Sequence, residues 1–459
     1  MERYDLVVIG SGPAGQRAAV QAAKLGRRVA LVERRQVVGG VCIHTGTIPS
    51  KTLREAILYL TGYAQHTVYG ASYAVKQNIE AGDLKVRVDH VIQREIDVVL
   101  SQLRRNGVEV IHGQAAFAGP HEVAVSGPQY DGTLHGEVIV LAVGTTPAPP
   151  SGIDCDDRVL VDSDGFVRLS RIPKTATVVG AGIIGVEYGS MLAALGVPVT
   201  LIDKRERLLD FVDREIADNL AYQLREKNMS IRLGEEVSRI LREDGRAVTE
   251  LSSGKRIVSD LALFSVGRLG DTAALNLPAA GLEADARGRL AVDAFFRTRV
   301  PHIYAVGDVI GFPSLASTSM EQGRLASCHA FGKDPSPMSP LLPFGIYSIP
   351  EISFIGPTEE ELTRVAVPYE VGISRYRELA RGQILGDDTG LLKLLFHRET
   401  RKLLAAHAIG TGATELIHIG QAAIALGGTL DYFIDTVFNY PTLAEGYKVA
   451  ALNCANKLS

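Results

Sequence analysis

The sequence contains one pattern twice, and this internal repeat constrains the fold more than any other feature. The segment YDLVVIGSGPAGQRAAVQAAKLGRRVALVER begins near Tyr4, and ATVVGAGIIGVEYGSMLAALGVPVTLIDKR begins near Ala176. Each copy has a β-branched run, a G-x-G-x-x-G turn, a helical stretch ending at glycine and a second apolar run ending in an acid. Because these parts recur at identical spacing, the pattern predicts two Rossmann-like units, each binding a dinucleotide.

The residues of each copy also predict how the dinucleotide is held. The first glycine makes a tight turn, the second lets the backbone approach a pyrophosphate, and the third lets the helix pack closely on the strand. Free N–H groups at the helix N-terminus point at the phosphates, and the acid accepts a hydrogen bond from a ribose hydroxyl. The residues concerned are Gly10, Gly12, Gly15 and Glu33 in the first copy and Gly180, Gly182, Gly185 and Asp203 in the second.

Two proline-rich segments suggest the domain limits. They are GTTPAPPSG (144–152), which follows a strand, and KDPSPMSPLLP (333–343), which follows a helical stretch. We expect an α/β fold with two dinucleotide-binding domains and a C-terminal α+β domain. The expected ranges are 1–148 and 272–340 for the first domain, 149–271 for the second and 341–459 for the third. Because the last domain has no nucleotide fingerprint, a dimerisation or substrate-covering role is favoured there over a third cofactor site.

Composition and charge exclude several other classes of protein. The net charge of -4 gives no reason to expect nucleic acid or an anionic membrane as a partner. No apolar run approaches the roughly 20 residues that span a bilayer. The segment MERYDLVVIG lacks the zones of a secretory signal, so a cytoplasmic location is expected. The four cysteines are scattered without metal-ligand spacing, which predicts neither a disulfide scaffold nor a metal site.

The motifs resemble those of the pyridine nucleotide-disulfide oxidoreductases, a flavoprotein family that includes glutathione reductase and dihydrolipoamide dehydrogenase. The resemblance covers essentially the whole chain: both fingerprints, GGVCIHTGTIPSK (39–51), AVGDV (305–309) and FNYPTLAE (438–445). It implies a glutathione reductase-like fold with FAD in the first unit and NAD(H) or NADP(H) in the second. It also implies at least a homodimer, with larger homo-oligomers left open.

The resemblance implies roles for individual residues. Lys51 would approach flavin N5, Asp308 would bind the ribityl chain, and Glu187 would pair with the lysine. On their own residue context, Lys51 also fits a solvated lysine at a helix start and Asp308 a turn acid. The positions assigned to FAD are Gly10, Gly12, Gly15, Glu33, Cys42, Lys51, Gly144, Gly307 and Asp308. Those assigned to the nicotinamide nucleotide are Gly180, Gly182, Gly185, Glu187, Asp203, Lys204 and Gly267.

Two departures from the family pattern decide the expected chemistry. Disulfide-reducing members read C-x-x-x-x-C in the first segment, whereas this chain pairs Cys42 with Thr47. They also read H-P-T-x-x-E near the end, where this chain has Tyr440. A hydroxyl cannot relay electrons as a thiolate does, and a phenol with an ordinary pKa of ~10 is a poor base at neutral pH. Both halves of the thiol machinery are therefore missing, and Thr47 is a candidate for a hydrogen bond near the flavin.

What remains is a flavin and a nicotinamide site, which together support hydride transfer from one nicotinamide to another. GTIPSK, GDVIGFPSLAS and the Tyr-Pro-Thr ending resemble the soluble pyridine nucleotide transhydrogenases within the family. That resemblance implies reversible exchange between NADPH and NAD⁺ by a ping-pong scheme. The alternatives are a dihydrolipoamide dehydrogenase-like disulfide reductase, an oxidase or peroxidase that cycles Cys42 through a sulfenic acid, and a non-enzymatic FAD-bound scaffold.

Such an exchange requires one pocket that accepts both nucleotides. Asp203 is a feature of NAD sites, and three cations follow it that can reach a 2′-phosphate: Lys204, Arg205 and Arg207. Lys204 is favoured because it is adjacent to the acid, while the two arginines fit a solvated loop equally well. His44 stays unassigned, and His418 is predicted to be a satisfied or core residue. The other cysteines are predicted to be structural: Cys155, Cys328 and Cys454.

Overall fold

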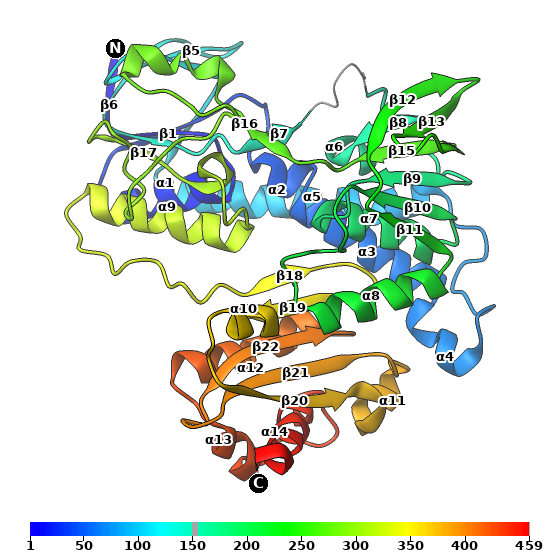
Figure 1. Cartoon of the computed structure of the whole chain (residues 1–459). Helices are drawn as coiled ribbons and strands as arrows, with labels where there is room; N and C mark the ends of the chain where they lie inside the picture. The colour runs from blue at the N-terminus through cyan, green and yellow to red at the C-terminus, as the bar shows by residue number, and fades with distance from the viewer. Residues whose placement is uncertain (149–154, 459) are drawn as a thin grey trace. The chain divides into compact units, whose positions relative to one another are not determined.

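The computed structural model describes residues 1–148 and 155–458, which form two compact units (Figure 1). Among these residues the first unit gathers 1–53, 85–148 and 267–339, and the second gathers 54–84, 155–266 and 340–458. Helices α3 (Thr47–Thr61) and α5 (Ala81–Arg105) contribute residues to both units. Residues 149–152 of the proline-rich linker, and the domain boundary placed at 149, lie outside the described residues. The remaining domain boundaries stay predictions.

The first unit is built on a seven-stranded mixed sheet. Its parallel part has the order β3-β2-β1-β6, and β17 also pairs in parallel with β6. The antiparallel strands β5 and β4 continue the sheet beyond β6. The strands are β1 (Glu2–Ile9), β2 (Val29–Glu33), β3 (Glu109–His112), β4 (Gln114–Gly119), β5 (Glu122–Ser126), β6 (Asp131–Leu141) and β17 (Ile303–Ala305). A separate antiparallel pair joins β7 (Thr145–Pro147) to β16 (Arg268–Gly270).

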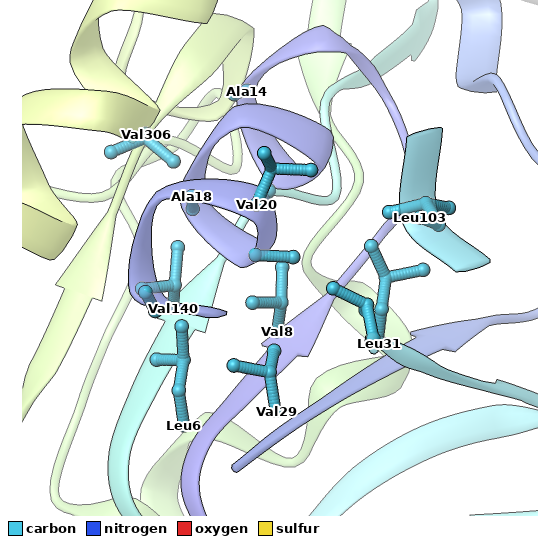
Figure 2. Close-up of a cluster of buried hydrophobic side chains, with 14 of the residues drawn as sticks. Leu6, Val8, Ala14, Ala18, Val20, Val29, Leu31, Leu103, Val140 and Val306 are labelled. Atoms are coloured by element: carbon cyan, nitrogen blue, oxygen red, sulfur yellow. The ribbon is translucent and has the colours of Figure 1, made fainter. Parts of the chain in front are cut away.

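The helices of the first unit cover this sheet because its central strands are apolar on both faces. All five residues of β2 are buried, as are the last four of β1, which is typical of a parallel sheet with helices on its faces. Figure 2 shows the core between α1 (Pro13–Lys24) and the sheet, with Leu6, Val8, Ala14, Ala18, Val20, Val29, Leu31, Leu103, Val140 and Val306 labelled. The unit also contains α2 (Gly40–His44), α9 (Ala316–Ala330) and the short 3₁₀ turns Ala273–Leu275, Leu277–Ala280 and Gly307–Ile310.

Helices α1 and α9 approach each other closely through small residues. A Cβ atom on Gly323 would lie 2.1 Å from the carbonyl oxygen of Ala14. One turn further along α9, the hydroxyl of Ser327 donates a hydrogen bond of 2.8 Å to the carbonyl of Ala18. The helix pair that supports the first glycine-rich turn is therefore in backbone contact, and only glycine fits at position 323.

The second unit contains a parallel sheet with the second fingerprint and two antiparallel sheets. The parallel sheet has the order β11-β10-β9-β15-β8, and one antiparallel sheet has the order β12-β13-β14. Its strands are β8 (Leu160–Asp162), β9 (Ala176–Val179), β10 (Val199–Asp203), β11 (Met229–Leu233), β12 (Val237–Glu243), β13 (Arg246–Leu251), β14 (Arg256–Ser259) and β15 (Leu261–Phe264). The accompanying helices are α4 (His66–Tyr69), α6 (Ser163–Phe166), α7 (Ile183–Ala194) and α8 (Arg214–Glu226), with a 3₁₀ turn at Tyr63–Gln65.

The C-terminal part of the second unit is an antiparallel sheet in the order β18-β19-β22-β21-β20. Its strands are β18 (Phe344–Ile346), β19 (Ile352–Ile355), β20 (Tyr369–Arg375), β21 (Leu391–His397) and β22 (Leu403–Ile409). The helices are α10 (Glu359–Arg364), α11 (Ala380–Leu385), α12 (Ala413–Ala425), α13 (Leu430–Asp435) and α14 (Glu445–Leu458), with a 3₁₀ turn at Tyr376–Glu378. The predicted α+β character of this region is confirmed. No helix among the described residues has the length and apolarity to cross a membrane.

A buried ionic cluster joins α8 to the C-terminal sheet inside the second unit. The fully buried Lys393 on β21 donates to Asp213 at 2.8 Å and also pairs with Glu359 and with Glu215. His407 on β22 is fully buried beside this cluster. Its Nε2 donates to the carbonyl of Pro357 at 3.1 Å, and its Nδ1 has no hydrogen-bond partner among the described residues. Burial lowers the pKa of His407, although the charge of Asp213 partly opposes the shift.

The close contact of α1 with α9 generates a stability prediction. The substitution Gly323→Ala forces a methyl group against the backbone of α1, so we expect it to lower the free energy of unfolding by about 1–3 kcal/mol. Thermal unfolding followed by circular dichroism measures the change. The matched control is Gly82→Ala on the exposed first turn of α5, where a Cβ meets nothing within 4 Å. A loss of stability in the control equal to that of Gly323→Ala would contradict this explanation.

The lowered pKa of His407 generates a prediction for pH. An unfolded histidine takes up a proton below about pH 6.5, while the buried His407 stays neutral, so the unfolded state binds more protons there. The stability contributed by His407 is therefore present above pH 6.5 and is lost as the pH falls towards the folded-state pKa. In His407→Gln the midpoint temperature should fall less between pH 7.5 and about 5.5 than in the wild type. Parallel pH profiles in scanning calorimetry would contradict this.

Candidate active site

The first glycine-rich turn lies between β1 and α1. Of its three fingerprint glycines, only the second has room for an added Cβ atom. Gly10 has φ +101°, and a Cβ there would lie 2.4 Å from the carbonyl oxygen of Ala142. A Cβ on Gly15 would lie 1.9 Å from the carbonyl oxygen of Gly10. By contrast, a Cβ on Gly12 would meet no atom within 4 Å. Packing within the protein thus requires the first and third glycines, and the space at the second fits a pyrophosphate at the uncapped N-terminus of α1.

Glu33 lies at the end of β2, buried beside this turn. Its Oε2 accepts hydrogen bonds from the backbone N–H and the hydroxyl of Ser11, at 3.0 and 2.5 Å. Its Oε1 accepts one bond, from the backbone N–H of Arg35 at 2.9 Å. Because a carboxylate has about four acceptor positions, Glu33 can still accept a bond from a ribose hydroxyl. The arrangement fits the predicted adenosine side of an FAD site.

The second glycine-rich turn repeats this geometry between β9 and α7. Gly180 has φ +106°, and a Cβ there would lie 2.6 Å from the carbonyl oxygen of Ser265. A Cβ on Gly185 would lie 1.9 Å from the carbonyl oxygen of Gly180, the distance found in the first turn. The nearest atom to a Cβ on Gly182 is Nη2 of Arg205, at 3.8 Å. The second turn therefore also fits a pyrophosphate, with an arginine above its second glycine.

The cations that follow Asp203 occupy three different environments. Lys204 is exposed, and Arg207 lies 3.8 Å from Glu360. Arg205 folds back onto Asp203, with which it forms bonds of 2.8 Å from Nη2 and 3.0 Å from Nε. Burial alone would raise the pKa of Asp203, but hydrogen bonds from Arg205 and from the backbone of Ala181 hold that pKa below its usual range. Of the two alternatives left open for Arg205, the structure shows a guanidinium paired with the acid, on a side chain that is 37% exposed.

Helices α2 and α3 carry three of the predicted flavin-side residues, Cys42, Thr47 and Lys51. Cys42 and Thr47 share a hydrogen bond, and Lys51 and Asp308 lie close enough to influence the thiol electrostatically. Burial raises the pKa of Cys42, and Thr47 and Lys51 only partly oppose this rise. A thiol with a raised pKa is protonated at neutral pH and is a weak nucleophile. His44 faces the carbonyl of Val38 at 2.9 Å.

Asp308 follows β17 in the 3₁₀ turn Gly307–Ile310, at the carboxyl end of a parallel strand where ligands bind in α/β sheets. Burial raises the pKa of Asp308, opposed by the charge of Arg268 and by a long hydrogen bond of 3.5 Å from Ser319. Gly307 has φ +81°, and its N–H donates to the buried Gln322 at 2.7 Å. Two further predicted glycines also have positive φ, Gly144 at +68° and Gly267 at +123°.

Glu187 lies in the second unit, on α7, two residues after the last glycine of the second fingerprint. It is 4% exposed, and its Oε1 accepts a hydrogen bond of 2.8 Å from the backbone N–H of Tyr347. Lys51 belongs to the first unit, so the predicted Lys51–Glu187 pair stays a prediction. Tyr440 is 74% exposed in the segment before α14.

Sequence reasoning missed the polar residues that hold these sites in place. Ser11 binds Glu33 through its side chain, Arg268 donates to Thr145, and Gln322 holds Gly307. Ser11 carries a sequence signal, since it stands between two glycines of the first turn, but Arg268 and Gln322 carry none. His418 is exposed on α12 and bonds Gln421 at 2.7 Å, so it is satisfied but not a core residue. Among the remaining cysteines, Cys328 and Cys454 are buried and Cys155 is partly buried.

Comparison with known proteins agrees with this geometry along the whole chain. Residues 4–323 match the family "Pyridine nucleotide-disulphide oxidoreductase", and residues 342–451 match the dimerisation domain of that family. A protein of Mycobacterium tuberculosis named "Soluble pyridine nucleotide transhydrogenase" is 54% identical, over 100% of this chain and 98% of its own. A protein of the same name from Colwellia psychrerythraea is 45% identical, over 99% of this chain and 98% of its own.

Among solved structures, the HOCl-induced flavoprotein disulfide reductase RclA from Escherichia coli has a TM-score of 0.87 and 28% identity. The alignment covers 98% of this chain and 99% of RclA. The two matched regions, the relatives and the shared fold lead to one assignment. The chain belongs to the pyridine nucleotide-disulphide oxidoreductase family.

Proposed function

We propose that the protein is an FAD-dependent transhydrogenase that transfers hydride reversibly between NADPH and NAD⁺. The observation that carries the proposal is the pair of Cys42 and Thr47, in which a hydroxyl stands where a disulfide reductase needs a second thiol. Cys42 forms no disulfide with the other described cysteines, and Thr47 offers no second thiol for a dithiol cycle. The relatives named transhydrogenase support the same activity.

The residues of the first unit have distinct tasks in this proposal. The turn around Gly12 holds the pyrophosphate of FAD, and Glu33 accepts a hydrogen bond from its ribose. Asp308 binds the ribityl chain, and Lys51 supplies a fixed positive charge next to the reacting ring, where a preorganised cation is most effective. A bound flavin supplies the hydride acceptor and donor, and Thr47 orients the segment by its hydrogen bond to Cys42.

The second unit binds and orients the nicotinamide nucleotides in turn. The turn at Gly180, Gly182 and Gly185 holds the pyrophosphate, and Asp203 with its neighbouring cations reads the adenosine ribose. Glu187 is held rigidly by the backbone of Tyr347 and is proposed to pair with Lys51. Because one pocket serves both nucleotides, the first product must leave before the second substrate binds.

Two further proposals concern the assembly and its location. The match of residues 342–451 to a dimerisation domain supports at least a homodimer. We place the enzyme in the cytoplasm, where thiols remain reduced, which agrees with cysteines that form no disulfide among the described residues.

The proposed reaction is tested by following both half-reactions without oxygen. Addition of NADPH to the FAD-loaded protein should bleach the flavin absorbance, because hydride passes to the ring. After NADP⁺ is removed, thio-NAD⁺ should restore the absorbance and be converted to its reduced form. A flavin that NADPH does not bleach would support the scaffold alternative, and reduction of lipoamide would support a disulfide reductase. Either result would overturn the proposal.

The role of Cys42 is tested by the variant Cys42→Ser. A serine keeps the size of the side chain and a hydrogen bond to Thr47, and the raised thiol pKa leaves little thiolate to lose. We expect the rate of NADPH-to-thio-NAD⁺ exchange to change by less than about threefold, a difference under 1 kcal/mol. A loss of several hundredfold would instead indicate a sulfenic acid cycle at Cys42. The flavin content of the variant, read from its absorbance, serves as the control for folding.

A further inference from the structure

Glu33 and Asp203, the acids assigned to the ribose in the two copies of the repeat, differ in how many of their acceptor positions are already hydrogen-bonded. Asp203 Oδ1 accepts the backbone N–H of Arg205 at 2.8 Å and its Nε at 3.0 Å. Asp203 Oδ2 accepts the N–H of Ala181 at 2.6 Å and Nη2 of Arg205 at 2.8 Å. Four donors fill the four acceptor positions of a carboxylate. A ribose hydroxyl can therefore bind Asp203 only after the Arg205 side chain has moved.

The first copy of the repeat provides an internal reference. Glu33 receives the same two backbone donors, from Ser11 and Arg35, at positions equivalent to Ala181 and Arg205. There, however, the arginine side chain makes no bond to the acid among the described residues, and the turn at Gly12 is open. The folded-back guanidinium is thus specific to the nicotinamide-binding copy and does not follow from the shared backbone.

A second carboxylate anchors the guanidinium of Arg205. Nη1 of Arg205 lies 3.1 Å from Asp210, which is on the far side of the group from Asp203. The arginine side chain is 37% exposed, whereas Asp203 is 7% exposed. Its Nη2 atom also lies above Gly182, where the pyrophosphate of a nucleotide approaches the turn, and it bonds Asp203, the acid assigned to the ribose. The Arg205 side chain can therefore break its bonds to Asp203 while its bond to Asp210 keeps the guanidinium next to the ligand.

We propose that Arg205 is the residue that allows this single pocket to accept both NAD(H) and NADP(H). With NADP(H), its guanidinium turns from Asp203 to the 2′-phosphate and stays anchored by Asp210. With NAD(H), the guanidinium swings off Asp203, which then accepts the 2′-hydroxyl. Either nucleotide must displace the ion pair between Arg205 and Asp203 before it can bind in the pocket. This inference rests on the proposed exchange between the two nucleotides and identifies the residue behind it.

Arg205 is a better candidate for this role than the neighbouring cations. Lys204 is exposed and, within the part of the chain that the structure describes, makes no bond to the acid or to the turn. Arg207 faces Glu360 rather than the turn. Arg205 is the cation whose atoms lie over Gly182, and its planar fork matches a phosphate better than an ammonium does.

The test measures binding of NADP⁺ and NAD⁺ to the oxidised, FAD-loaded protein by calorimetry, where no hydride can move. In Arg205→Gln we expect the Kd of NADP⁺ to rise about 10- to 100-fold, the range of a lost charged hydrogen bond. The Kd of NAD⁺ should stay the same or fall, because Asp203 is no longer covered. In Asp203→Asn the effect should reverse, with NAD⁺ weakened more than NADP⁺.

Matched variants make the result specific to Arg205. Arg239→Gln removes an exposed arginine of β12 and should change neither Kd by more than about twofold, since distant surface charges are screened. Arg205→Lys keeps the charge without the fork and should fall between the wild type and Arg205→Gln for NADP⁺. Arg205→Lys also replaces Arg205→Gln in the binding test if the glutamine variant does not fold.

Three outcomes would overturn the inference. These are equal weakening of both nucleotides in Arg205→Gln, no weakening of NADP⁺, or a selective loss of NADP⁺ in Lys204→Gln instead. Adenosine 2′,5′-bisphosphate and 5′-AMP provide the same comparison without the nicotinamide. Because neither fragment can transfer hydride, selective loss of the bisphosphate would stand even if the proposed transhydrogenase activity failed.

Discussion

The close approach of a strand and a helix at a glycine turn determines the geometry of both halves of this protein. At Gly15 and at Gly185 a single added carbon would lie 1.9 Å from a backbone oxygen. That spacing brings the helix N-terminus over the end of the strand and points its N–H groups outward. It also places the acid at the end of the next strand beside the turn, where it bonds the backbone of the turn. The phosphate and ribose positions are therefore set by packing before any ligand binds.

The same backbone can nevertheless support different ligand preferences, because side chains decide what remains accessible. In the first copy Ser11 provides two donors to Oε2 of Glu33 and the backbone of Arg35 provides one to Oε1, which leaves one acceptor position available. In the second copy Ala181 stands at the position of Ser11. Side-chain donors to Asp203 come instead from Arg205. The duplication therefore retains the phosphate site and changes the ribose site. The two copies therefore differ in the side-chain donors to the acid, while the backbone donors are the same.

The sequence predicts the fold well because glycine spacing and apolar runs are local signals of backbone geometry. Both strand–turn–helix–strand units lie where the pattern places them, and so do the C-terminal sheet and helices. The pairing of Arg205 with Asp203 was not predictable, because charge order along a loop does not specify side-chain direction. For the same reason Lys204 was favoured by its position alone. Gln322 and Arg268 act on Gly307 and Thr145 through contacts distant in sequence, which no local pattern records.

The loss of thiol chemistry also has a physical consequence beyond the missing cysteine. A second thiol at position 47 would need Cys42 to ionise readily, yet burial raises the pKa of Cys42 despite the nearby Lys51. Thr47 suits this environment, since a hydroxyl satisfies the buried thiol by a hydrogen bond and remains neutral. The charge of Lys51 opposes the raised pKa of Cys42 only in part, so it does not turn the thiol into a thiolate. In the segment around Cys42, burial and the hydrogen bond to Thr47 therefore favour a protonated thiol.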